Sequence, residues 1–157
     1  MFSVVCFQSG TRIFERMEYY CLDKFEKLPI GTWNLLLDKV LVKATHLEVS
    51  QTFSELPFSP AFIAASVPLP PHIPRVYSFT HRFLLTPEVV AEVRSRKYQD
   101  WWDWSKCDSE DPAFYEGDVL LLGTISHEDI VVMLLDESSR NELKSQGIDF
   151  WCTWSSS

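Results

Sequence analysis

The segment QDWWDWSKCDSEDPAFYEGD at residues 99–118 runs directly into two apolar segments, VLLLGTI at 119–125 and IVVMLL at 130–135. Both apolar segments are hydrophobic at consecutive positions, which is typical of strands buried on both faces. Because four polar residues at 126–129 separate them, a central antiparallel hairpin with a tight turn is expected. The acidic, aromatic segment before the hairpin is expected to form an irregular loop.

The loop and the hairpin carry a strong excess of negative charge. Residues 99–136 contain ten acidic residues against the single Lys106, and three tryptophans lie close together at the start. Negative potential beside indole rings suits the arginine and lysine side chains of a basic protein. The candidate partner-binding residues are therefore Trp101, Trp102, Asp103, Trp104, Asp108, Glu110, Asp111, Tyr115, Glu116, Glu128 and Asp129.

Apolar periodicity predicts helices in the remaining sequence. A helix is expected over residues 11–28, where apolar residues recur every three or four positions. A second helix is expected to begin at Thr86–Pro87, a typical N-cap followed by a typical first helical residue. A short helix at 138–147 would end at a glycine. Residues 32–53 are expected to form a helix followed by a strand.

A short apolar run predicts a strand at 2–7, and alternating apolar residues predict further strands at 76–85 and 148–154. The proline-rich segment at 56–74 is expected to cross the surface in an extended conformation, with one short turn at 60–65. Together these elements predict an α+β fold in which helices pack on one mostly antiparallel sheet. The length of 157 residues predicts a single globular domain over residues 1–157.

Composition and charge argue against several classes of partner. With a net charge of −8 and a pI near 4.9, the chain is poorly suited to binding nucleic-acid phosphates, which requires Lys and Arg. Six prolines in the uncharged run at 56–74 exclude a membrane-spanning helix there. The amino terminus lacks a signal-peptide pattern. A cytoplasmic protein with a basic protein partner, and with no nucleic-acid or membrane partner, is expected.

Residue types with catalytic or metal-binding chemistry are present but do not form complete motifs. The four cysteines are Cys6, Cys21, Cys107 and Cys152. Their spacing matches no zinc or CxxC pattern, so free thiols are expected, and all except Cys107 are interpreted as core residues. The acidic neighbours of Cys107 disfavour its thiolate. His46 and His127 have carboxylates nearby but lack the other ligands of a metal motif. No catalytic residue, metal or cofactor is expected.

Two segments show a resemblance to a known family. One is LLTPEVVAEV at 84–93, where a strand enters a helix with a Leu-x-Pro-Glu type of start, and the other is LLLGTISHEDIVVMLLD at 120–136. With the acidic stretch between them, they resemble the SUKH superfamily of bacterial immunity proteins, which includes regulators of the Smi and Knr type. The resemblance covers about residues 78–136. It implies an intracellular protein that neutralises a toxin, often a nuclease or another basic enzyme, by covering it.

Three functions follow as hypotheses. The first is a protein-binding inhibitor, an immunity or antitoxin protein that blocks the active surface of a basic toxin through the acidic loop and hairpin. The second is a small hydrolase or transferase that uses Cys107 or His127 with carboxylates of the loop. The third is a regulatory subunit of a larger assembly, with an interface at the apolar edge around Trp151 and Trp154.

Overall fold

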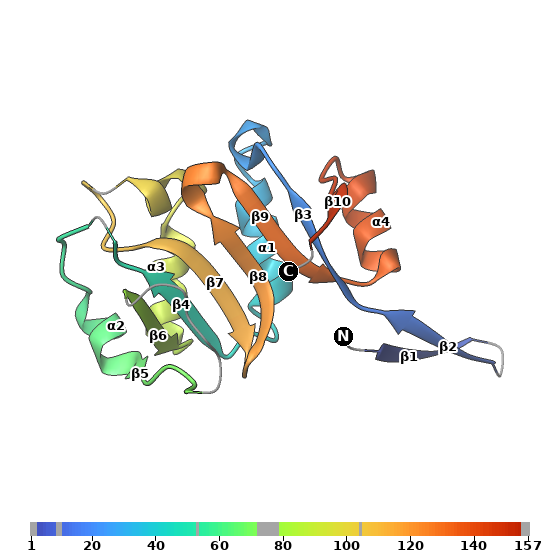
Figure 1. Ribbon diagram of the computed structural model, residues 1–157, viewed down its shortest axis with the longest axis horizontal. Helices are drawn as coiled ribbons and strands as arrows, with labels where there is room; N and C mark the ends of the chain where they lie inside the picture. The colour runs from blue at the N-terminus through green and yellow to red at the C-terminus, as the bar shows by residue number, and fades with distance from the viewer. Residues whose placement is uncertain (1–2, 9–10, 53, 72–78, 104, 155–157) are drawn as a thin grey trace.

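The computed structural model describes residues 3–8, 11–52, 54–71, 79–103 and 105–154, with side chains described from residue 16 onward. An eight-stranded antiparallel sheet forms its centre (Figure 1). In order of pairing, its strands are β10 (Cys152–Thr153), β3 (Glu18–Leu22), β9 (Ile130–Leu135), β8 (Val119–Ile125), β7 (Glu110–Glu116), β4 (His46–Ser50), β6 (Thr80–Leu84) and β5 (Ser66–Val67). A separate hairpin of β1 (Ser3–Gln8) and β2 (Thr11–Arg16) extends beyond the sheet.

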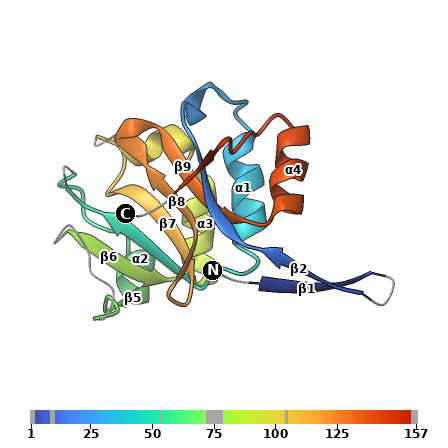
Figure 2. The same ribbon diagram turned by 45° about the vertical axis from the view of Figure 1, so that its right-hand side comes forward.

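The helices lie on one face of this sheet (Figures 1 and 2). They are α1 (Thr32–Val40), α2 (Pro60–Ala65), α3 (Pro87–Ser95) and α4 (Glu137–Ser145), and the short 3-10 helices are η1 (Phe25–Lys27), η2 (Tyr98–Trp102) and η3 (Ser126–Glu128). Strands and helices that share one core confirm the expected α+β fold.

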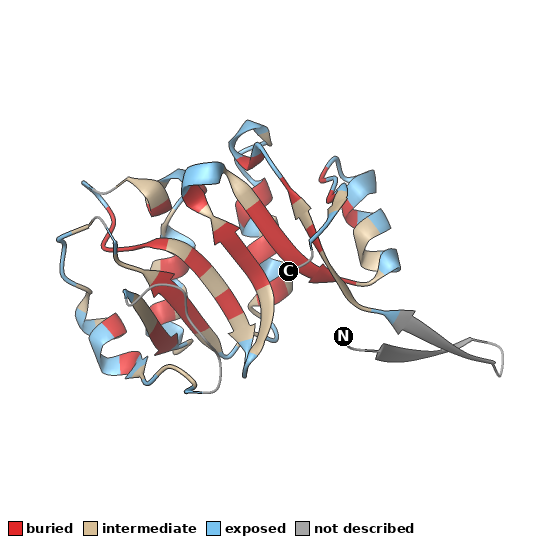
Figure 3. Cartoon of the chain, viewed as in Figure 1, coloured by how far each residue is buried: buried red, intermediate tan, exposed pale blue. Residues whose placement is uncertain are grey.

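The core is built on a row of side chains that crosses the sheet. Paired residues place Phe83, Leu47, Phe114, Leu122 and Met133 side by side on neighbouring strands. All five are buried, and they join the buried side chains of α1 and α3 in one cluster. Figure 3 shows the resulting buried stripe through the central strands. Burial of this apolar surface is the main term that stabilises the fold.

The central hairpin is confirmed. β8 and β9 pair antiparallel, with Leu122 opposite Met133, and they occupy adjacent positions near the middle of the sheet. The turn between them is η3 followed by Asp129, which takes the left-handed conformation at φ 54°. The Asp129 carboxylate accepts hydrogen bonds from the Glu26 amide and the Tyr98 hydroxyl. These contacts fix the position of the turn.

The expected start of α3 is confirmed, and the helix expected at 138–147 is α4, which begins one residue earlier and ends at Ser145. The Thr86 hydroxyl accepts a hydrogen bond from the Val89 amide, and Pro87 occupies the first helical position. The Asp136 carboxylate caps α4 in the same way. Gly147 follows α4 with φ 85°, a conformation that costs other residues free energy. The helix and strand expected in residues 32–53 are α1 and β4.

The prediction of a helix over residues 11–28 is wrong. This segment forms β2, β3 and η1. In β3, Tyr20 and Leu22 face the core, and the strand pairs with β9, which lies more than one hundred residues away in the sequence. Aromatic residues suit strands as well as helices, so the distant partner determined the outcome.

The prediction of an irregular loop at 99–118 is also wrong in part, because the second half of this segment forms strand β7 between β4 and β8. The inward positions of β7 are Glu110, Pro112 and Phe114, so the alternation of apolar residues that marks a half-buried strand is hidden. Pro112 cannot donate to a ladder, and it lies where the register between β7 and β4 is irregular. Of the strand expected at 148–154, two residues form β10.

The proline-rich segment contains more regular structure than expected. Its predicted turn is helix α2, whose Ser59 cap accepts a hydrogen bond from the Phe62 amide. The strand expected at 76–85 is β6, and residues 72–78 lie outside the described part of the chain. Among the described residues, no helix combines the length and apolar character needed to cross a membrane.

Candidate functional site

Trp101 is part of the core rather than of the surface. Its side chain is completely buried, and the Arg96 guanidinium stacks over its ring at 4.6 Å. Phe62 lies on the same guanidinium at 5.0 Å. Two aromatic rings therefore contact one cation, an arrangement that stabilises the end of α3 against η2. The prediction that Trp101 binds a partner directly is wrong, because no face of the ring is accessible.

Asp108 neutralises that cation. Its two carboxylate oxygens each lie 3.1 Å from a nitrogen of Arg96, a bidentate ion pair. The Asp108 side chain is 8% exposed and the Arg96 side chain 15%. Asp108 was predicted to lie at an exposed partner surface. Instead, its charge is satisfied within the fold by the ion pair with Arg96.

Two further predicted acids also have structural positions. Glu110 is buried at the start of β7. Asp111 has a left-handed backbone at φ 53°, and its carboxylate accepts a hydrogen bond of 2.6 Å from the Ser126 amide. The Asp111 amide donates to the Ser126 hydroxyl in return. This reciprocal pair fastens β7 to η3. The Asp111 carboxylate is therefore already engaged within the fold.

Trp102 and Asp103 do reach the surface. Trp102 is partly exposed and lines a shallow hollow of about 570 Å³ together with Gln99, Asp103 and Ser105. The Trp102 ring packs edge-on against Tyr98, with ring centres 5.3 Å apart, and Tyr98 is anchored by Asp129. The ring is therefore supported from behind while part of it remains accessible to a ligand.

Asp103 provides negative charge at the rim of this hollow. A hydrogen bond from the Ser105 hydroxyl lowers the pKa of Asp103, and the Ser105 amide and Lys106 add to the effect. The Ser105 hydroxyl lies 2.6 Å and the Lys106 ammonium 3.3 Å from the Asp103 carboxylate. Asp103 is therefore fully ionised at neutral pH, and its side chain is 34% exposed.

The turn η3 adds a second carboxylate. η2 contacts η3, and the hydrogen bond from Tyr98 to Asp129 joins the two elements. Glu128 is 55% exposed, and its carboxylate lies 3.8 Å from the imidazole of His127. We call Gln99, Trp102, Asp103, Ser105 and Glu128 the Trp102 surface.

Tyr115 and Glu116 do not belong to the Trp102 surface. They lie at the carboxyl end of β7, whereas Asp111 and its bond to η3 lie near the beginning of that strand. Glu116 is exposed, and the Arg82 guanidinium lies 5.4 Å from the centre of the Tyr115 ring. Trp104 lies outside the described residues. The predicted residues are thus divided among the core, the Trp102 surface with η3, and the carboxyl end of β7.

A buried ion pair lies near the carboxyl end of β7. Arg82 and Glu48 face each other on β6 and β4, with 2.7 Å between nitrogen and oxygen and side chains 4% and 5% exposed. Asp118 lies 3.6 Å from the same guanidinium. Burial lowers the pKa of the neighbouring His46, and the positive charge of Arg82 adds to this effect. Sequence patterns cannot identify this group, because its partners come from distant segments.

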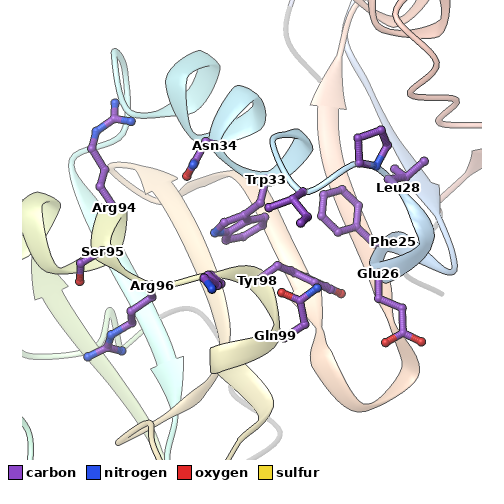
Figure 4. Close-up of a pocket in the computed structure, with 13 residues that line it drawn as sticks. Phe25, Glu26, Leu28, Trp33, Asn34, Arg94, Ser95, Arg96, Tyr98 and Gln99 are labelled. Carbon is purple, nitrogen blue, oxygen red and sulfur yellow. The ribbon is translucent and has the colours of Figure 1, made fainter.

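A second hollow lies between the start of α1 and residues 94–99 (Figure 4). Its volume is about 270 Å³, and its aromatic lining comes from Phe25, Trp33 and Tyr98. Figure 4 shows the Arg96 guanidinium pointing away from Trp33, which agrees with its ion pair to Asp108. The volume lies just below the range of about 300–1,000 Å³ that is typical of small-molecule sites.

The two residues proposed for catalysis differ in exposure. Cys107 is 4% exposed, and burial raises the pKa of its thiol despite the nearby Arg96. A protonated, buried thiol is a poor nucleophile. His127 lies in the exposed turn η3. Within the described part of the chain, no three His, Cys, Asp or Glu side chains gather as metal ligands would.

The edge around β10 exposes two aromatic residues. Trp151 and Trp154 are 58% and 38% exposed, and the Trp151 indole donates a hydrogen bond of 3.1 Å to Asp23. The interpretation of Cys21 and Cys152 as core residues is wrong. Both are partly exposed free thiols, because in β3 it is Tyr20 and Leu22, on either side of Cys21, that point inward.

Comparisons of this chain with known protein families, with curated proteins and with solved structures found no match.

Proposed function

We propose that this protein is a binding protein that holds a basic protein partner at the Trp102 surface. The observation that carries the proposal is the partly exposed Trp102 ring, which lines a hollow beside the ionised Asp103 and is supported from behind by Tyr98. An arginine or lysine side chain placed in this hollow would contact the face of the indole and the carboxylate together.

The two kinds of residue would have different roles. Asp103 lies at the rim of the hollow, and Glu128 is exposed in the neighbouring turn η3. Because the chain also has a net charge of −8, the two acids would accelerate the encounter with a positively charged partner. Trp102 would act later, because a supported aromatic side chain in a desolvated hollow is a typical energetic hot spot. Rim charge thus controls association, and the ring controls dissociation.

An immunity or antitoxin role is the most specific form of this proposal. It rests on the resemblance of residues 84–93 and 120–136 to the SUKH superfamily, in which the partner is a toxin that is neutralised by being covered. The surface chemistry is compatible with a basic enzyme as that partner. We therefore propose inhibition of a basic toxin domain, through binding alone and without a cofactor.

The proposal is tested with the product of the neighbouring gene as the first partner. The two proteins are produced separately, and association is followed by stopped-flow fluorescence at low and at physiological salt. Neutralising Asp103 and Glu128 together, as Asp103→Asn and Glu128→Gln, is expected to slow association about threefold to tenfold at low salt. Trp102→Ala is expected to weaken the complex at least about tenfold, mainly through faster dissociation.

Glu142→Gln with Asp149→Asn provides a matched control. Both residues are exposed, and they lie on or just after α4, at the opposite end of the molecule from η2 (Figure 1). This control removes the same charge and is expected to leave the association rate within about twofold of the parent. If the two double variants slow association equally, the general charge of the chain is responsible and the Trp102 surface is not the binding site.

A further inference from the structure

Cys21 and Cys152 lie directly opposite each other on neighbouring antiparallel strands. β3 and β10 pair with Cys21 opposite Cys152 and Tyr20 opposite Thr153. Cys152 also lies near enough to the Cys21 thiol to raise its pKa. Both side chains are partly exposed, so a reagent in solution has access to them. They come from sequence positions far apart, and the sheet brings them together.

The Cα spacing at this position falls in the range of disulfide bonds. The Trp154 amide donates to the Tyr19 carbonyl at 2.8 Å, so Tyr19 and Trp154 form a hydrogen-bonded pair of the ladder. Cys21 and Cys152 lie two residues further along and are therefore the same type of pair, whose Cα atoms are typically about 5.5 Å apart. Disulfides usually join Cα atoms roughly 4.4–6.8 Å apart. The hydrogen bond from Trp151 to Asp23 holds the other side of the pair.

We propose that Cys21 and Cys152 are a reversible disulfide site that reacts with small-molecule disulfides such as glutathione disulfide. The Cys152 thiolate attacks one sulfur of glutathione disulfide and releases one glutathione. The Cys21 thiolate then attacks the Cys152 sulfur of this mixed disulfide and releases the second glutathione. The protein loses two protons and two electrons, and glutathione disulfide is reduced to two glutathione thiols.

The order of attack follows from the surroundings of Cys21. Burial and the adjacent Cys152 raise the pKa of Cys21 to about 11, and Asp23 adds to the effect. Its thiolate is therefore scarce at neutral pH, which favours Cys152 as the first nucleophile. Cys21 then reacts within the molecule, where the pairing of the strands already holds it next to the mixed disulfide.

The bond would fasten the carboxyl-terminal edge strand to the sheet. β10 contains two residues, whereas the covalent loop would span the chain from residue 21 to residue 152. A disulfide that closes so long a loop restricts the unfolded state strongly. The midpoint of thermal unfolding is expected to rise by roughly 5–10 °C on oxidation. Reduction would return it to the original value.

The experiment uses the full chain. The reduced protein is equilibrated with excess glutathione disulfide, digested without reduction and analysed by mass spectrometry, and its thermal midpoint is measured before and after dithiothreitol is added. The expected result is a linked pair of peptides containing Cys21 and Cys152 and a reversible rise in the midpoint. Cys21→Ser and Cys152→Ser should each abolish both, and Cys152→Ser should also react more slowly with glutathione disulfide.

Cys107→Ser is the matched control, because Cys107 is buried away from the pair and this variant should still form the bond. A Cys6→Ser variant should behave likewise. The proposal is overturned if the oxidised protein carries glutathione on Cys21 or Cys152 without a linked peptide, or if the linkage joins other cysteines. Neither the bond nor its absence bears on the Trp102 surface, so this test is independent of the proposed function.

Discussion

Arg96 is held by contacts of two kinds. Phe62 and Trp101 contact its guanidinium group through their rings, and Asp108 binds it through both carboxylate oxygens. Removing one partner of a largely buried ion pair leaves the other charge without compensation, which costs far more than the pair itself contributes. Asp108 therefore has a role in stability, although it belongs to the segment with the greatest excess of acids.

Asp108→Asn is expected to lower the free energy of unfolding by about 1–3 kcal/mol, because Arg96 would lose its bidentate partner and be left with the Glu92 carboxylate at 3.8 Å while staying mostly buried. Urea denaturation at neutral pH measures the change. Asp103→Asn is the matched control in the same segment, and it should change stability much less than Asp108→Asn, because Asp103 is partly exposed and pairs with the exposed Lys106. Equal effects of the two substitutions would contradict the structural role of Asp108.

Tyr98 gives a second prediction at the scale of single residues. Burial raises the pKa of Tyr98 above its ordinary value of 10.0, and the hydrogen bond to Asp129 adds to the effect. The folded protein therefore keeps the phenol proton where the unfolded chain releases it. The corresponding stability is fully present below about pH 10 and is lost as the pH rises above that value.

Tyr98→Phe is expected to cost about 1 kcal/mol near neutral pH, because the hydrogen bond to Asp129 is removed. The difference in free energy of unfolding between the variant and the parent should shrink as the pH rises from about 9 to about 11, since only the parent has this phenol and loses its contribution. Urea unfolding at several pH values measures both effects. Tyr19 and Tyr20 also have raised pKa values and titrate in both proteins. A difference that stays constant with pH would exclude the proposed linkage.

At the scale of elements, local signals were sufficient for some segments and failed for others. α3 was predictable because Thr86, Pro87 and Glu88 are neighbours in sequence and act on the same helix end. β3 was not, because its aromatic and apolar residues fit either structure until β9 provides hydrogen bonds. β7 could not be predicted, because two of its inward-facing positions carry Glu110 and Pro112 instead of large apolar residues. In both failures, contacts between distant segments outweighed local preference.

Thr86→Ala tests the local part of this account. The Thr86 hydroxyl accepts a hydrogen bond of 3.2 Å from the Val89 amide, and removing such a cap costs about 1 kcal/mol of stability. Thr86→Ser keeps the hydroxyl and should remain within about 0.5 kcal/mol of the parent. Thermal or urea unfolding distinguishes the two. If both variants are equally destabilised, the methyl group of Thr86 matters and the cap does not.

At the scale of the whole molecule, the sheet decides which of the predicted site residues come together. Trp102, Asp103 and Glu128 were predictable from charge and aromatic content. Gln99 and Ser105 were not, because they carry neither charge nor an aromatic ring, and only the turn of η2 brings them to the hollow. Asp108 and Asp111 were assigned to the surface because sequence shows charge but not the Arg96 and Ser126 partners that satisfy it.

The central claim is that a cationic ligand binds beside Trp102. Titration of the isotope-labelled protein with a hexa-arginine peptide, followed by amide and indole chemical shifts, tests it most directly. The account predicts that the chemical-shift changes concentrate in η2, in η3 and at residues 103, 105 and 106, and that they include the Trp102 indole. These changes should disappear at about 0.5 M salt. Shifts spread evenly over the molecule, or centred on the edge at Trp151 and Trp154, would contradict it.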